Sequence, residues 1–140
     1  MIDPDVVLVY LGASDDLILG DDPEFLSPAA GLQRQAIMSE AVALLRANGA
    51  EVVWNLPAVP LESGVFYCGG EIEDTPCDAD WIARWQQDLL TVGERTGIRL
   101  LDVPGWVAAR GTDPSDRPDG LHLSGPALDD QARWIAGQLP

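Results

Sequence analysis

The chain has 140 residues, 46% of them hydrophobic, and a formal net charge of −15 at pH 7. This length fits one domain with a single core, and the hydrophobic content is typical of a folded protein. The excess of acidic residues argues against nucleic acid as a partner, because a phosphate backbone binds basic surfaces. No segment is apolar over the length that a membrane span needs, and the residues after Met1 lack the basic start of a secretion signal.

The predicted elements of the first half are a strand, a helix and a second strand. The β-rich apolar run at 6–11 predicts a strand that is buried on both faces of a parallel sheet. After an acidic loop, Ser27 and Pro28 supply a capping hydroxyl and a proline for the first helical turn. The helix is expected to end at Asn48-Gly49, and residues 51–54 predict the second strand.

The second half repeats this order. Residues 58–78 are rich in Pro, Gly and acids and predict a long surface loop, after which a helix is expected to run to Gly97. Residues 98–103 predict a third strand and residues 113–119 a polar loop. Ser124 opens a final helix, whose predicted inward positions are Leu128, Ala132, Ile135 and Leu139.

Strands that alternate with helices predict parallel strands joined by right-handed crossovers. We therefore expect an α/β fold with about three strands and three main helices. Three strands are few for this class, and the first strand begins almost at Met1. Both observations suggest that one edge of the sheet lacks a partner.

No metal or cofactor is expected. Cys68 and Cys77 and the one distant histidine do not supply the four ligands of a zinc site. The two cysteines are either unpaired thiols or a small disulfide, which would indicate an oxidising compartment. The acidic loop at 15–22 lacks the spacing of a calcium loop, and Gly12-x-Ser14 lacks the further glycines of a dinucleotide loop.

Two polar segments are predicted to meet at the carboxyl ends of the strands, where open α/β sheets place their active sites. Gly12 and Ser14 follow the first strand, and Asp119 and His122 follow the third. An aspartate three residues before a histidine can orient the imidazole, which then takes a proton from a hydroxyl. The only histidine of the chain is therefore a candidate general base, although a lone histidine in a loop is also often structural.

The segments "DPDVVLVYLGASD" and "RPDGLHLSGPALDDQARWIAGQL" resemble two conserved blocks of the SGNH/GDSL hydrolases. These blocks are a strand that ends in Gly-x-Asn-Asp, and Asp-x-x-His followed by a helix. Between them, "LLRANGAEVVWNLP" and "TGIRLLDVPGW" match the usual order of helix, strand and proline turn. The resemblance covers essentially residues 1–140 and implies one domain with a three-layer, flavodoxin-like parallel sheet. The chain is most similar to extracytoplasmic members, including those fused to membrane acyltransferases, that act on O-acylated carbohydrate.

The resemblance also implies roles for individual residues. His122 would be the general base and Asp119 its orienting partner. Gly12 would shape the oxyanion loop, and Ser14 occupies the position of an oxyanion-hole asparagine. The family's Gly-Asp-Ser block, which carries the nucleophile, is not found upstream of Asp3, so the chain resembles the C-terminal two-thirds of the fold. Alternatively, "GASDD" is a degenerate form of that block and Ser14 is the nucleophile.

Further expectations concern the pocket and the substrate. Asp15 and Trp106 are candidate pocket residues, whereas most of the other tryptophans are expected to pack in the core. The resemblance implies an esterase that removes an acyl group such as O-acetyl from a small molecule or carbohydrate, and that is incomplete or inactive as this chain alone. The alternative is a non-catalytic relic, or a carbohydrate-binding or interaction module.

An exposed edge of the first strand could also mediate self-association or pairing with another chain. The resemblance and a Cys68–Cys77 disulfide would both point to an extracytoplasmic location, although the chain shows no signal peptide.

Overall fold

The computed structural model describes residues 4–11, 27–58, 79–111, 113, 115–118 and 122–140, and Cys68 and Cys77 lie outside these ranges. Strands and helices alternate within the described ranges as the sequence predicts, with one further helix. The elements are β1 (Val6–Val9), α1 (Pro28–Leu45), β2 (Glu51–Asn55), α2 (Ala79–Thr96), β3 (Arg99–Leu101), α3 (Val103–Arg110) and α4 (Gly125–Gln138). No described helix has the length and apolar character needed to cross a membrane.

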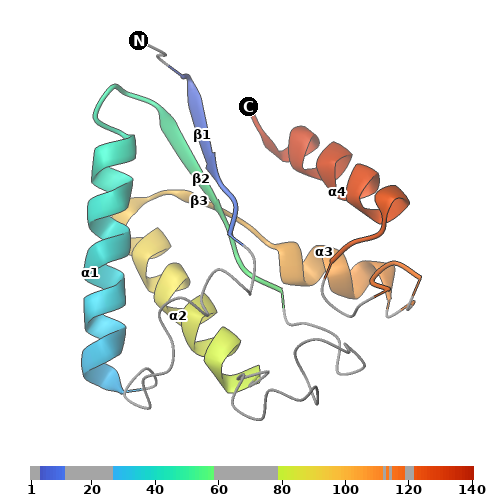
Figure 1. Ribbon diagram of the computed structural model, residues 1–140. Helices are drawn as coiled ribbons and strands as arrows, with labels where there is room; N and C mark the ends of the chain where they lie inside the picture. The colour runs from blue at the N-terminus through green and yellow to red at the C-terminus, as the bar shows by residue number, and fades with distance from the viewer. Residues whose placement is uncertain (1–3, 12–26, 59–78, 112, 114, 119–121) are drawn as a thin grey trace.

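β2 is the central strand of a parallel sheet whose order, over the described strands, is β1-β2-β3. Val9 of β1 lies opposite Trp54 of β2, which in turn lies opposite Leu100 of β3. Because all the strands run in the same direction, their carboxyl ends meet at one edge of the sheet (Figure 1). The predicted α/β class and parallel sheet are confirmed.

Helices cover both faces of this sheet, with α1 and α2 on one side and α4 on the other (Figure 1). Val52 and Trp54 of β2 pack into the core formed with α1 and α2. Val53 points the other way and packs with Trp134 and Ile135 of α4. Val52 and Val53 are fully buried, because alternate side chains of a central parallel strand enter two separate cores.

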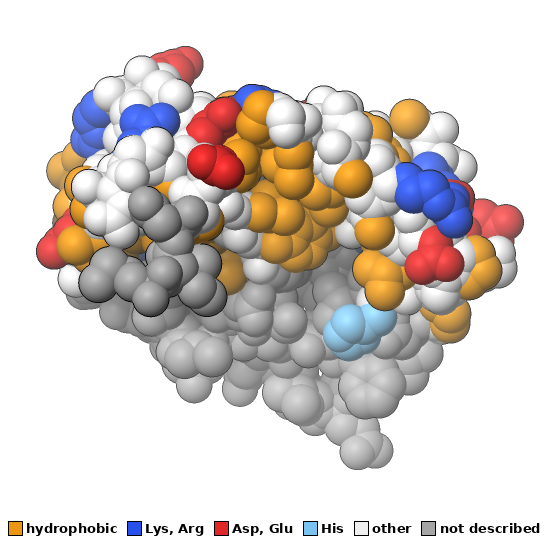
Figure 2. Space-filling view, turned by 90° about the horizontal axis from the view of Figure 1, so that it is seen from above, with side chains coloured by type: hydrophobic (Ala, Val, Ile, Leu, Met, Phe, Trp, Pro, Cys, Tyr) orange, Lys and Arg blue, Asp and Glu red, His pale blue; other side chains and the backbone are white. Residues whose placement is uncertain are grey.

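The side chains of β1 are only partly buried, so the prediction that this strand is buried on both faces was wrong. Leu8 is 37% exposed and Tyr10 is 44% exposed. Hydrophobic side chains gather over the middle of the face shown in Figure 2. A short apolar run does not reveal whether its strand is central or at an edge, because both kinds use the same β-branched residues.

α3 was not predicted, because residues 98–103 read as one strand. β3 ends at Leu101, and Asp102 then caps a helix, its Oδ1 accepting a hydrogen bond of 2.9 Å from the Gly105 N–H. Pro104 lies in the first turn of this helix. A capping aspartate followed by proline is a helix start, and this signal was read instead as the end of a strand.

The inward face of α4 was predicted only in part. Ile135 and Leu139 pack against the core on this side of the sheet as expected. Leu128 is 54% exposed and Ala132 is also exposed. Ala127 and Gln131, one residue earlier in each case, are buried in their place. The prediction failed because it followed apolar residues alone, whereas a glutamine occupies one of the buried positions.

A buried carboxylate joins α1 to α2. Asp88 of α2 is 1% exposed and accepts hydrogen bonds from Arg34 Nε, at 2.9 Å, and from Gln35 Nε2, at 2.7 Å. Arg84 Nε lies 3.7 Å from the second carboxylate oxygen. A charge at this depth is tolerated only with partners of opposite charge, so the cluster fixes how the two helices lie against each other.

Candidate functional site

Only two of the predicted site residues lie within the described part of the chain. His122 is exposed on the loop that leads into α4, and the single histidine is visible on the surface in Figure 2. Trp106 lies in α3 and is half-buried. The predicted residues outside the described ranges are Gly12, Ser14, Asp15 and Asp119.

Tyr10 ties the end of β1 to α4 and to the loop that precedes His122. Its hydroxyl donates a hydrogen bond of 2.6 Å to Oε1 of Gln131, a residue that is 3% exposed. The Arg117 guanidinium lies near enough to Tyr10 for the two groups to interact electrostatically. The described residues next to both predicted segments therefore lie together, at the carboxyl edge of the sheet.

Burial dominates the electrostatics of this contact. Burial raises the pKa of Tyr10, and the positive charge of Arg117 and the hydrogen bond to Gln131 only partly oppose this rise. Burial likewise lowers the pKa of Arg117, against the effects of Tyr10 and Asp116. The phenol therefore stays protonated at neutral pH and keeps its role as a donor.

Asn55, the last residue of β2, holds the backbone of Leu11. Its Oδ1 accepts from the Leu11 N–H at 2.8 Å, and its Nδ2 donates to the Leu11 carbonyl at 2.9 Å. Asn55 is 2% exposed, so these bonds are largely shielded from water. The chain is thus held to the sheet at the residue directly before Gly12.

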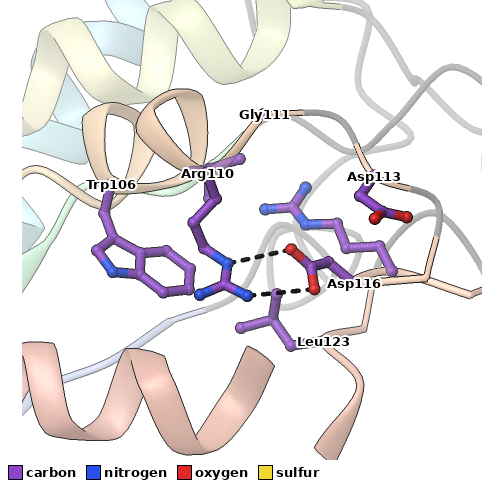
Figure 3. Close-up of a pocket in the computed structure, with 8 residues that line it drawn as sticks. Trp106, Arg110, Gly111, Asp113, Asp116 and Leu123 are labelled. Carbon is purple, nitrogen blue, oxygen red and sulfur yellow. Dashed lines mark hydrogen bonds and ion pairs between the residues drawn. The ribbon is translucent and has the colours of Figure 1, made fainter. Parts of the chain in front are cut away.

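The loop that carries His122 is closed at its base. The Ser124 N–H donates to the Asp116 carbonyl at 2.8 Å. Arg110 of α3 donates from Nε and Nη2 to the two carboxylate oxygens of Asp116, at 3.1 and 3.2 Å (Figure 3). Its Nη1 donates to Asp130 of α4 at 2.9 Å. These bonds join α3, the loop and α4, and hold both ends of segment 117–123.

A shallow pocket lies beside this loop, with a volume of about 260 Å³ including the solvent at its mouth. Trp106 and Arg110 form one wall, with the guanidinium carbon 5.1 Å from the centre of the indole ring (Figure 3). Trp106 also packs against Trp134, at a ring separation of 6.0 Å. The lining includes Leu123, the residue that follows His122 in the sequence, and does not include His122 itself.

Asp113 lines the same pocket and is exposed. Its Oδ1 accepts the Ser115 backbone N–H at 2.9 Å, and this bond holds the pKa of the Asp113 carboxyl below its usual range. An ionised carboxylate in a pocket can accept hydrogen bonds from a ligand that carries hydroxyl groups. Among the described residues, no three His, Cys, Asp or Glu side chains are grouped so that they could hold a metal ion.

Sequence reasoning missed four residues that build this region. Tyr10 belongs to an apolar run, where nothing marks its hydroxyl, and Arg110 and Asp116 flank the end of the unpredicted helix α3. Asn55 did carry a signal. A polar residue that ends a buried apolar strand must find hydrogen-bond partners nearby.

Comparison with known proteins identifies the family. The model of the GDSL-like lipase/acylhydrolase family matches residues 1–126 of the 140. No match was found among curated proteins or among solved structures. The matched range includes the strand that leads into Gly12 and the loop that carries His122. The parallel α/β architecture is compatible with this assignment. The chain belongs to the GDSL-like lipase/acylhydrolase family and is an esterase-type domain of that family.

Proposed function

We propose that this domain hydrolyses a carboxylic ester, such as the O-acetyl group of a carbohydrate or other small molecule, with His122 as general base and Asp119 as the carboxylate that orients it. One observation carries the proposal: the Tyr10 hydroxyl, at the end of β1, donates a hydrogen bond of 2.6 Å to Gln131 of α4, the helix that follows the His122 loop. Tyr10 stands two residues before the predicted segment that begins at Gly12. The exposed histidine is open to a substrate, and the ends of its loop are held in place.

The chemistry assigned to these residues is serine acyl transfer. A serine Oγ attacks the ester carbonyl while the His122 imidazole accepts its proton. The resulting tetrahedral intermediate expels the alcohol, which takes that proton from the imidazolium. Water then attacks the acyl-enzyme with the same histidine as base, releases the carboxylic acid and restores the serine. Asp119 would stabilise the imidazolium in both steps.

Two serines are candidates for the nucleophile. We favour a serine in a Gly-Asp-Ser segment that lies outside the 140 residues, because Asp3-Pro4-Asp5 and the following strand fit the block that carries the oxyanion hole. Gly12 and Ser14 then supply donors to the oxyanion, an interaction that commonly stabilises the transition state by about 3 kcal/mol. The second candidate is Ser14 itself.

The pocket beside Trp106 is proposed to bind the alcohol part of the ester. The part of the Trp106 indole that Arg110 and Trp134 leave uncovered offers an apolar surface to a sugar ring, and the Asp113 carboxylate accepts hydrogen bonds from its hydroxyls. Asp15 is a second candidate for this polar role. Leu123 lines the pocket and follows His122 in the sequence, so the proposed binding site and the proposed base belong to the same loop.

The test is hydrolysis of p-nitrophenyl acetate by the protein as the gene encodes it, and by its His122→Ala variant. We expect kcat to fall by about 10³-fold or more in the variant. Added imidazole should restore part of the activity. Asp129→Ala changes an exposed residue of α4 and is the matched control, which should keep full activity. Equal activity in wild type and His122→Ala would contradict the assignment.

Absence of hydrolysis in all variants would favour the alternative function, a carbohydrate-binding module that keeps the fold without catalysis. The pocket at Trp106 makes that alternative testable. Sugar-dependent quenching of tryptophan fluorescence that disappears in Trp106→Ala would support it.

We further propose that the 140-residue chain, by itself, associates with a second copy through β1. The outer edge of β1 has no strand partner among the described residues, and an unpaired edge offers backbone donors and acceptors to another strand. Sedimentation should then show dimers at micromolar concentration. A monomer at every concentration tested would contradict this proposal.

A further inference from the structure

We infer that Asn55 is a positioning residue for ester hydrolysis: its side-chain amide fixes the point where the chain leaves β1, and with it the corner that begins at Gly12. This inference rests on the proposed function, in which Gly12 and Ser14 supply the oxyanion donors. It assigns no contact between Asn55 and the substrate.

The Asn55 amide continues the sheet after the backbone ladder has ended. The last paired residues of β1 and β2 are Val9 and Trp54. Beyond them, Asn55 Oδ1 accepts the Leu11 N–H and Asn55 Nδ2 donates to the Leu11 carbonyl, at 2.8 and 2.9 Å. A neighbouring strand would offer the same combination of one acceptor and one donor. One side chain therefore takes the place of a peptide group.

The chemistry of the site selects an amide at this position. An aspartate could accept from the Leu11 N–H but could not donate to its carbonyl when ionised, and it would bring a charge into a site where Asn55 is 2% exposed. An apolar residue would leave both backbone groups without this partner. The two residues before Asn55 are Val53 and Trp54, so packing alone would favour a hydrophobic residue here.

The end of β1 is held in two directions at consecutive residues. Tyr10 reaches α4 through its hydroxyl, at 2.6 Å from Gln131, and Leu11 is bound to β2 through its backbone. Leu11, the residue directly before Gly12 in the sequence, is therefore held in place. Oxyanion donors must lie within a few tenths of an ångström of the developing charge, and a misplacement of about 1 Å can cost 10²-fold in rate.

Two variants test the inference. Asn55→Leu is close to asparagine in size and removes both hydrogen bonds. Asn55→Asp keeps the acceptor and loses the donor. The matched control is Gln86→Ala, because Gln86 Nε2 also donates to a backbone carbonyl just after β2, that of Pro57, at 2.7 Å. Each protein is assayed for kcat and KM on p-nitrophenyl acetate at pH 8, and for hydrogen exchange of the Leu11 amide.

We expect kcat to fall by about 10- to 100-fold in both Asn55 variants, because neither keeps the bond from Nδ2 to the Leu11 carbonyl, with KM changed by less than about twofold. The Leu11 amide should exchange faster in Asn55→Leu and stay protected in Asn55→Asp. Gln86→Ala should match the wild type in both measurements. Because a smaller folded fraction also lowers the apparent kcat without changing KM, kcat is normalised to the folded fraction that circular dichroism measures.

The inference is overturned if the wild type is active and both Asn55 variants match Gln86→Ala in kcat. If the wild type itself is inactive, the proposed function fails, and Asn55 is judged by exchange alone. If the Leu11 amide is then equally protected from exchange in Asn55→Leu, the role of Asn55 in holding the Leu11 backbone is also overturned. If Asn55→Leu does not fold, the kcat of Asn55→Asp decides.

Discussion

The hydrogen bond between Tyr10 and Gln131 connects the end of β1 to α4, and a double-mutant cycle on this pair measures the connection. Tyr10→Phe removes the hydroxyl that donates to Gln131 Oε1 at 2.6 Å. Gln131→Leu removes the acceptor and replaces it with an apolar side chain of similar size. The double variant places two apolar groups where the hydrogen bond was.

The expected magnitudes follow from burial. Tyr10→Phe loses a hydrogen bond with a net value of about 1 kcal/mol and leaves an acceptor on Gln131, which is 3% exposed. Because Tyr10 is 44% exposed, water can partly replace the lost partner, so we expect a total loss of about 1–2 kcal/mol. Gln131→Leu should cost about 1 kcal/mol. The double variant should lose about 1 kcal/mol less stability than the sum of the two single losses. This difference is the coupling energy of the pair.

The assay is urea unfolding at pH 7, followed by circular dichroism, for the wild type, both single variants and the double variant. A loss of 1 kcal/mol should also lower Tm by about 3–4 °C in a chain of this length. Losses that add within about 0.3 kcal/mol would refute the coupling. The two side chains would then not be in contact in solution, and the placement of Arg117 and the His122 loop beside the end of β1 would lose its main support.

Three further predictions concern stability. Asp88→Asn should lower the free energy of unfolding by about 3–5 kcal/mol, because it removes the buried carboxylate that pairs with the Arg34 guanidinium, and an unchanged urea midpoint would contradict this. Gly97→Ala should cost about 1 kcal/mol by the same assay, since Gly97 has φ +67° and any residue with a Cβ is strained there. Burial raises the pKa of the Tyr10 phenol above its value in the unfolded chain. Unfolding at about pH 10 and above therefore releases the phenol proton, so the free energy of unfolding should fall as the pH rises. The fall between pH 9 and 11 should be smaller in Tyr10→Phe, and identical pH dependence would show that this phenol is not buried.

The features that the sequence predicted well are those with a strong local cause. Ser27 and Pro28 mark the start of α1, and the Ser27 hydroxyl does accept the Ala30 N–H, at 3.2 Å. Gly97 marks the end of α2, where its positive φ lets the chain turn into β3. The β-rich run at 51–54 predicts β2, because a parallel strand covered on both faces is apolar along its whole length.

Features that depend on the neighbours of an element were harder to predict. The run at 6–11 is as apolar as that of a central strand, yet β1 lies at the edge of the described sheet. Gln131 is buried in α4 because the Tyr10 hydroxyl, which is far away in sequence, provides its partner. Only the fold brings such pairs together.

The candidate site divides in the same way. The Asp119 and His122 spacing and the Gly12-x-Ser14 segment are local patterns in the sequence, and the roles assigned to them stay predictions. The residues that fix their surroundings come from separate elements, as with Arg110 and Asp116 around the loop base. These partners hold backbone and loops and carry no proposed chemistry, so no chemical motif marks them in the sequence.

The central claim is that His122 activates a serine for attack on an ester. Its most direct measurement is the rate at which a fluorophosphonate labels the protein as the gene encodes it, with the adduct mapped by mass spectrometry. We predict one labelled serine, either Ser14 or that of a Gly-Asp-Ser segment, and a labelling rate about 10³-fold lower in His122→Ala. No adduct at all, or an adduct that forms equally fast without His122, would contradict the account.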